Sequence, residues 1–335
     1  MTLAKTLVAA VALIAATSAA ETAAAQANPA VIFDRGGKFD KSFNEASYNG
    51  AERFKAETGI GYAEFEVQQD AQREQALRRF AERGNNPIVT AGFSSATAVQ
   101  TVAAEFPETQ FAIIDAVVDL PNVRSVIFKE QEGSYLVGVL AAMASKSGKV
   151  GFVGGMDIPL IQKFACGYVQ GVKATNPEAE VFQNMTGNTP EAWNDRPRGA
   201  EIARSQIDRG ADVIYHAAGG TGIGVLEAAA DAGVLGIGVD SNQNALHPGK
   251  VLTSMLKRVD NAVYDALTDA NKGEWTSGVV VMGLQEDGVG WALDENNAAL
   301  ITPEMKAAAD TARDKIISGE IVVHDYTTDG ACPAS

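Results

Sequence analysis

The two halves of the sequence repeat one order of elements. In the first half, "VTAGFSSATAVQTVAAEFPETQFAIID" reads as a strand, a loop of small residues, a helix and a second strand that closes on Asp115. In the second half, "YHAAGGTGIGVLEAAADAGVLGIGVD" repeats this order and closes on Asp240. The spacing is similar, since 23 positions separate Gly92 from Asp115 and 21 separate Gly219 from Asp240. Two similar α/β lobes are the simplest explanation of this repeat.

The opening units of the two halves also match. Aligning Gly50 with Gly171 places Phe43 opposite Phe164. Short runs rich in Val and Ile alternate with longer Ala-rich stretches at helical spacing, which predicts parallel sheets covered on both faces. We therefore expect two doubly wound parallel-sheet lobes joined by a hinge. The N-terminal lobe is expected to hold residues 28–148 and about 253–282, and the C-terminal lobe residues 149–252 and about 283–335.

Ligands of such sheets bind beyond the carboxyl ends of the strands, where loops lead into helix N-termini. The stretch "FDRGGKFDKSFN" occupies such a position, and so do Asp115, Gly219, Gly220 and Asp240. If the lobes face each other, these positions converge on one cleft. This arrangement is typical of a type I periplasmic binding protein, in which hinge closure traps a small solute.

The first 27 residues have the features of a signal peptide. Lys5 precedes the apolar core "LVAAVALIAATSAA", and Ala25-Gln26-Ala27 fits a cleavage site, so the mature chain is expected to begin near Asn28. No cysteine stands at this point to carry a lipid anchor, and no later run approaches the ~20 apolar residues of a membrane span. We therefore expect a soluble, monomeric periplasmic protein.

Net charge limits the expected binding partners, and the cysteine content allows one disulfide. A net charge of -15 repels nucleic acid and anionic lipid, so neither is expected as a partner. The two cysteines, Cys166 and Cys332, are able to pair in an oxidising compartment, and two separate thiols are the alternative.

Motifs of enzymes and metalloproteins are missing from the sequence. The three histidines lack metal-ligand spacing, and no G-x-S-x-G elbow occurs, so we expect neither catalysis nor a metal. The stretch "AAGGTGIG" imitates a dinucleotide fingerprint but has Val225 where the third glycine is required, so no cofactor is expected.

One motif is specific. From Asp34 to Gly50 the chain reads Asp-x-Gly-Gly-x-x-Asp-x-Ser-Phe-Asn-x-x-x-x-x-Gly. The plain interpretation is a strand end, a tight turn and a helix from about Phe43, capped by Asp40 or Ser42. The pattern also resembles the opening signature of the basic membrane protein family. Members of that family are substrate-binding proteins of ABC transporters, and they include purine nucleoside receptors. The likeness continues through "GGMDIPLIQKFACGYVQG", "AGGTG", "GVDSNQ" and "TSMLKRVDNAV".

This resemblance implies a base stacked on aromatic rings and ribose hydroxyls held by carboxylates and an amine, chemistry that the residue types here also suit. Phe43 is the first stacking candidate, while Phe164, Trp193 and His216 more often have packing or surface roles. The glycines before the second-half helix let the backbone approach the ligand. The remaining candidates are Asp34, Asp40, Asn44, Asp115, Gly220, Asp240 and Lys257. Each aspartate taken alone is equally well explained as a helix cap.

The sequence therefore predicts the receptor of an ABC importer. Its expected partners are permease subunits and a purine nucleoside such as adenosine, guanosine or inosine. Three alternatives remain open: a binding protein for another small polar solute such as a sugar, a sensor that passes its ligand to a membrane receptor, and an enzyme.

Overall fold

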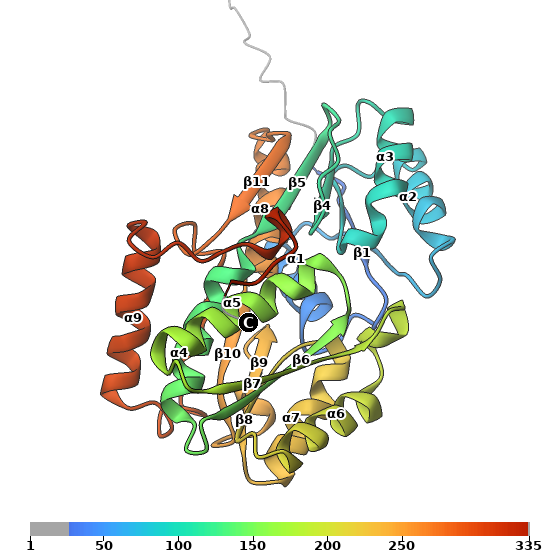
Figure 1. Ribbon diagram of the computed structural model, residues 1–335. Helices are drawn as coiled ribbons and strands as arrows, with labels where there is room; N and C mark the ends of the chain where they lie inside the picture. The colour runs from blue at the N-terminus through green and yellow to red at the C-terminus, as the bar shows by residue number, and fades with distance from the viewer. Residues whose placement is uncertain (1–26, 334–335) are drawn as a thin grey trace, which may run out of the picture.

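The computed structural model describes residues 27–333. The signal peptide expected at residues 1–27 lies outside this range except for its last residue. Within the described range, no helix is long and apolar enough to cross a membrane. The chain folds into two α/β lobes, each built on a six-stranded sheet (Figure 1).

The sheet of the first lobe is parallel throughout, in the order β11-β5-β4-β3-β1-β2. Along each strand, successive side chains point to opposite faces of the sheet. Val31 and Val89 pack under helices α1 and α8, while Ile32 and Ile88 pack under α2 and α3. The elements are β1 (Ala30–Phe33), α1 (Phe43–Thr58), β2 (Ala63–Glu66), α2 (Gln72–Glu82), β3 (Ile88–Thr90), η1 (Phe93–Ser95), α3 (Ala96–Glu105), β4 (Phe111–Ile114), β5 (Val123–Phe128), α8 (Val259–Lys272) and β11 (Gly278–Met282).

The second sheet repeats the design in the order β12-β10-β9-β8-β6-β7, and only the edge strand β12 is antiparallel. Helices α6 and α7 cover one face, α4 and α5 cover the other, and α9 packs against α4. The elements are α4 (Glu130–Ala144), β6 (Lys149–Met156), α5 (Pro159–Thr175), β7 (Glu180–Gly187), η2 (Pro190–Trp193), α6 (Arg196–Asp208), β8 (Val213–Ala217), η3 (Gly219–Thr221), α7 (Gly222–Asp231), β9 (Leu235–Asp240), η4 (Asn244–Leu246), β10 (Val251–Lys257), β12 (Val289–Trp291), α9 (Pro303–Ile317) and η5 (Tyr326–Thr328).

The repeat seen in the sequence has a packing cause. A Cβ atom at Gly50 of α1 would overlap the backbone of Asp260 in α8, and one at Gly171 of α5 would overlap the backbone of Tyr135 in α4. Both glycines therefore let two helices approach closely on the equivalent face of each lobe. These close contacts occur at the two glycines that align in the sequence repeat.

Packing and sheet membership suggest lobe boundaries that differ from those expected. Helix α4 packs against α5 and α9, and β10 pairs with β9, so both belong with the second sheet. We propose that the chain crosses between the lobes near Lys129 and Arg258, where crossings after residues 148 and 252 were expected, and near Gly283, next to the crossing expected after residue 282. The first two positions differ because the sequence does not reveal which sheet the helix α4 covers or which sheet the strand β10 joins.

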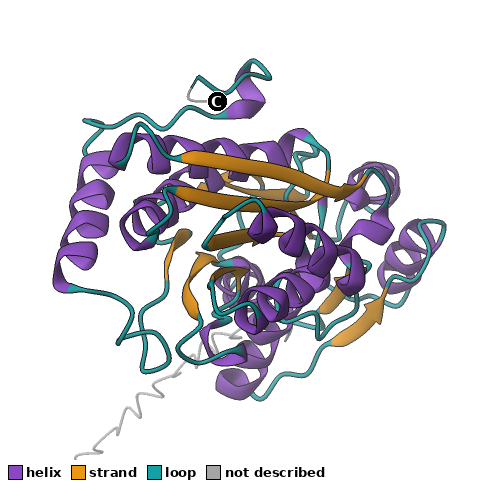
Figure 2. Cartoon of the chain, turned by 60° about the horizontal axis from the view of Figure 1, so that its bottom comes forward, coloured by secondary structure: helices purple, strands orange, loops and turns teal. Residues whose placement is uncertain are grey.

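The two cysteines form a disulfide in the second lobe. Cys166 lies on α5, and Cys332 lies in the segment after α9, which folds back on α5. Figure 2 shows this end of the chain lying against the outside of the helical layer. Gln170 on α5 also holds the segment, because its amide donates to the His324 carbonyl (3.1 Å) and accepts from the His324 N–H (2.9 Å). The bridge therefore stays within one lobe.

We expect that replacing Cys332 by Ser lowers the melting temperature, because the bridge closes a loop across 166 positions. Chain entropy estimates the loss at up to about 4–5 kcal/mol. Calorimetry of the oxidised, reduced and Cys332→Ser proteins measures this loss of stability. Reduction must leave the melting temperature of the Cys332→Ser variant unchanged. Two titratable thiols in freshly purified, unreduced, denatured protein would contradict the bridge.

Candidate ligand-binding site

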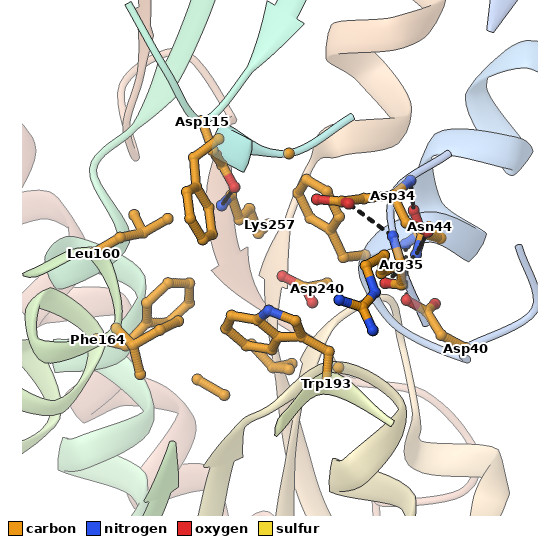
Figure 3. Close-up of a pocket in the computed structure, with 17 residues that line it drawn as sticks. Asp34, Arg35, Asp40, Asn44, Asp115, Leu160, Phe164, Trp193, Asp240 and Lys257 are labelled. Atoms are coloured by element: carbon orange, nitrogen blue, oxygen red, sulfur yellow. Dashed lines mark hydrogen bonds and ion pairs between the residues drawn. The ribbon is translucent and has the colours of Figure 1, made fainter. Parts of the chain in front are cut away.

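One pocket lies between the carboxyl ends of the two sheets. It contains about 600 Å³ of empty space, including the part open to solvent, within the range of small-molecule sites. Both lobes line it, and Figure 3 shows their side chains converging. The lining residues are Asp34, Arg35, Asp40, Phe43, Asn44, Gly92, Phe93 and Asp115 from the first lobe, and Leu160, Ile161, Phe164, Trp193, Ala217, Gly219, Val239, Asp240 and Lys257 from the second.

Nine of the eleven ligand residues predicted from sequence line this pocket, and His216 and Gly220 do not. The His216 ring is fully buried, lies against Gly222 and contacts the Gln243 side-chain oxygen through Nε2 at 2.9 Å. Burial lowers the pKa of His216 to about 4, so the ring is neutral. Its place near the end of β8 indicated the pocket, but the side chain lies against Gly222 at the start of α7 instead. Gly220 lies beside the Trp193 carbonyl, and its neighbour Gly219 reaches the pocket.

The loop between β1 and α1 is held by its own polar side chains. Asp40 accepts from the backbone N–H groups of Ser42, Asn44 and Glu45 at 2.8, 3.0 and 3.1 Å, so it caps α1 as the helix-cap alternative predicted. Burial raises the pKa of Asp40 to about 6, against the effect of these hydrogen bonds. Asn44 accepts from the Asp34 N–H and donates to the Asp34 carbonyl. The motif thus shapes the loop as well as lining the pocket.

Two aspartates occupy matching positions in the two lobes. Asp115 directly follows β4 and Asp240 ends β9, and both have a left-handed backbone with φ of 71° and 62°. Such conformations are strained for residues other than glycine and occur often at functional sites. The Ser42 hydroxyl of the first lobe donates to the Asp240 carboxylate. Burial raises the pKa of Asp240 to about 7, although the Lys257 charge opposes the shift.

A buried charge cluster supports one wall of the pocket. The Lys257 ammonium lies 2.7 Å from Asp115 Oδ2 and 2.9 Å from Glu130 Oε1, and Lys163 Nζ lies 2.6 Å from Glu130 Oε2. Burial favours neutral Lys257, but the nearby carboxylates outweigh it and hold the Lys257 pKa above its usual value. Burial would raise the pKa of Glu130, but the two lysines lower it. Asp115 Oδ1 is buried and finds no hydrogen-bond partner among residues 27–333.

Aromatic rings surround this ammonium and extend across the pocket. Lys257 Nζ lies 5.3 Å from the Phe43 ring centroid and 5.5 Å from that of Phe164. Trp193 reaches the pocket centre from η2, beside Phe164 (Figure 3), and its indole lies over Gly155, where any side chain would overlap it. The pocket therefore combines flat apolar surfaces with carboxylates and one ammonium.

Sequence reasoning missed several lining residues and the buried partners Glu130 and Lys163. Phe93 follows β3 at the position that matches Gly220 in the repeat, so the repeat alignment could have indicated it. Arg35 joins the lobes through an ion pair of 2.6 Å with Glu191. No pattern distinguishes Glu130 or Lys163 from ordinary helix residues. Among residues 27–333, no cluster of three or more His, Cys, Asp or Glu is arranged to hold a metal ion.

Two facing lobes around a pocket of this kind are typical of solute-binding proteins, and comparison with known proteins names the family. Residues 27–327 match the family described as "ABC transporter substrate-binding protein PnrA-like". The chain belongs to this family, as the opening signature predicted. It is therefore a substrate-binding protein of an ABC transporter.

Individual relatives agree over most of their length. The chain is 36% identical to the CD4+ T-cell-stimulating antigen of Listeria monocytogenes, covering 88% of this chain and 87% of the relative. It is 33% identical to the ABC transporter nucleoside-binding protein BmpA of Lactococcus lactis, covering 88% of each.

Solved structures confirm the expected fold. A solute-binding protein of an ABC transporter system from Aeropyrum pernix aligns with a TM-score of 0.81 and 30% identity, over 89% of this chain and 94% of that one. One from Conexibacter woesei aligns with a TM-score of 0.74 and 25% identity, over 90% and 99%.

We expect Asp240→Asn to stabilise the protein. Because the folded-state pKa of Asp240, about 7, exceeds its ordinary value of 3.8, the folded state binds the proton more tightly, and stability falls as pH rises through this window. Urea unfolding should show the variant more stable by about 2–4 kcal/mol at pH 8, with the gain shrinking toward pH 4. Exposed Asp231→Asn is the control. A gain that is independent of pH would contradict a raised pKa.

Proposed function

We propose that this protein is the periplasmic receptor of an ABC importer for a purine nucleoside, which it traps by closure of the two lobes without chemistry. The observation that carries the proposal is the combination of Phe43, Phe164 and Trp193 with Asp240 and Lys257 in one interlobe pocket. The name of the Lactococcus lactis relative, a nucleoside-binding protein, supports the same ligand class.

Aromatic side chains supply the surface for the base. Phe43 begins α1 in the first lobe and Phe164 lies on α5 in the second, so a flat ligand placed between them touches both lobes. Stacking contributes roughly 1–3 kcal/mol per base and tolerates different purines. Contact with both lobes would also favour the closed arrangement, because the ligand then bridges the two rigid bodies.

The ribose is assigned to the polar wall of the pocket. Lys257 donates to hydroxyl oxygens, and the carboxylates of Asp240 and Asp115 accept from hydroxyl protons. Within the part of the chain that the structure describes, Asp115 Oδ1 has no hydrogen-bond partner, while the carboxylate's other oxygen is held by Lys257. A ligand hydroxyl would satisfy this buried acceptor, which is otherwise costly to leave unpaired.

The remaining parts of the proposal concern location and partners. The N-terminal 27 residues direct export and are removed, and the mature monomer delivers its ligand to permease subunits. A sugar-binding protein or a sensor on the same scaffold is the second candidate, since sugar sites also combine rings with carboxylates. Two measurements separate the candidates. One is the ultraviolet absorbance of ligand extracted from the purified protein, and the other compares its affinity for nucleosides with its affinity for pentoses. Steady release of free base would instead indicate an enzyme.

Phe43→Ala should weaken inosine binding by about ten- to a hundredfold, because stacking on the base is lost. Isothermal titration calorimetry measures the affinity, and the melting temperature confirms folding. Phe39→Ala is the matched control, since Phe39 lies in the same loop, is 59% exposed and does not line the pocket. Unchanged affinity of the Phe43 variant would contradict the stacking assignment.

Asp240→Ala and Lys257→Met should weaken inosine binding by about ten- to a hundredfold, because a ribose hydroxyl loses its partner in a closed pocket. Hypoxanthine, the free base of inosine, should bind the variants and the unsubstituted protein alike. Competition titrations with both ligands measure the two affinities. Equal weakening of inosine and hypoxanthine would show that these side chains do not hold the ribose.

A further inference from the structure

A buried arginine lies behind the pocket wall. Arg73 on α2 is 4% exposed and does not line the pocket. Its Nη2 lies 2.6 Å from Asp34 Oδ1, and its Nη1 donates to the Ser95 hydroxyl at 3.2 Å. Its Nε also donates to Asp70, which is largely exposed. The guanidinium is therefore fixed from three sides, and Asp34 is its partner at the pocket.

The two oxygens of Asp34 have different surroundings. Oδ1 receives the Arg73 guanidinium and also the Arg35 backbone N–H at 2.7 Å. Oδ2 lies against Gly92, where a Cβ atom would overlap it. Gly92 has φ of 92°, a conformation that favours glycine, and it lines the pocket together with Asp34. Among residues 27–333, the groups that the protein donates to this carboxylate go to Oδ1, and Oδ2 receives no hydrogen bond.

We propose that Arg73 is a positioning residue that sets the ligand preference of the pocket, by holding Asp34 ionised with Oδ2 free to accept a hydrogen bond from the edge of the base. The inference rests on the proposed function. Figure 3 shows Asp34 beside Asn44 and Arg35, apart from the Lys257–Asp115 pair assigned to the ribose, so the far edge of the purine faces Asp34.

The charge state of Asp34 decides which bases fit. An ionised carboxylate only accepts hydrogen bonds, whereas a protonated one also donates. Burial raises the pKa of Asp34, and the Arg73 charge opposes this shift. With Arg73 present the pocket favours a base that donates from N1–H, such as the 6-oxopurine of inosine. Without Arg73 the carboxyl protonates more readily and suits a base whose N1 is an acceptor.

Calorimetry with inosine and purine riboside tests this preference, because purine riboside has the same ribose but no N1 proton and no substituent at C6. Arg73→Met should weaken the binding of inosine about tenfold or more, because a hydrogen bond to a charged acceptor is lost. The affinity for purine riboside should stay unchanged or increase. Raising the pH should restore inosine binding to the variant, because it ionises Asp34 again. Arg73→Lys, which keeps the charge, should restore part of the preference.

Arg78→Met is the matched control on the same helix. The Arg78 guanidinium pairs with Glu74 and Glu105 away from the pocket, so its loss should change neither affinity. Should Arg73→Met fail to fold, Arg73→Lys alone decides: a lower ratio of inosine to purine riboside affinity than in the unsubstituted protein supports the inference, and an unchanged ratio overturns it.

The outcomes separate this inference from the proposed function. Equal weakening of both ligands by Arg73→Met would reduce Arg73 to a structural residue and overturn the inference alone. Absence of binding of either nucleoside to the unsubstituted protein would overturn the proposed function, and this inference with it.

Discussion

The pocket depends on the buried contact between Lys257 and its two carboxylates. Lys257 ends β10 and Glu130 begins α4, both at crossings between the lobes, while Asp115 follows β4 in the first lobe. Lys163 on α5 completes the charge balance of the cluster. Removing one member of such a buried group typically costs about 3–5 kcal/mol, because its partner is left charged and desolvated. One cluster therefore fixes both the connection of the lobes and the wall of the site.

The site also carries features that oppose stability. Asp115 and Asp240 have a strained backbone, and burial disfavours the charged form of Asp240. Evolution toward stability alone would favour other residues at these positions. A ligand that supplies hydrogen bonds to these carboxylates would offset their desolvation and so stabilise the folded protein. The matching geometry in both lobes indicates that the repeat unit carries this feature.

Much of the candidate site was predictable because its residues follow strands. Residues at the carboxyl ends of parallel strands meet at one edge, so Asp34, Asp115 and Asp240 were placed together without coordinates. His216 shows the limit, since its strand ends at the pocket but its side chain is buried against Gly222 at the start of α7. Arg73 shows a second limit, because helical periodicity at most predicts that the side chain faces the core and does not predict which residue it contacts.

The sequence by itself determined the two-lobe fold, the repeat, the family signature and the presence of a cap near Phe43, because these depend on local periodicity and turn chemistry, but it left Asp40 and Ser42 as equal candidates for that cap. Only the tertiary structure decided which charges meet. Glu130 lies 127 positions from Lys257 in the chain, and their ion pair forms only because two lobe crossings lie side by side. Pairing of buried charges is set by the packing of distant elements, and that packing assigns Arg73 to Asp34 and Lys257 to Asp115.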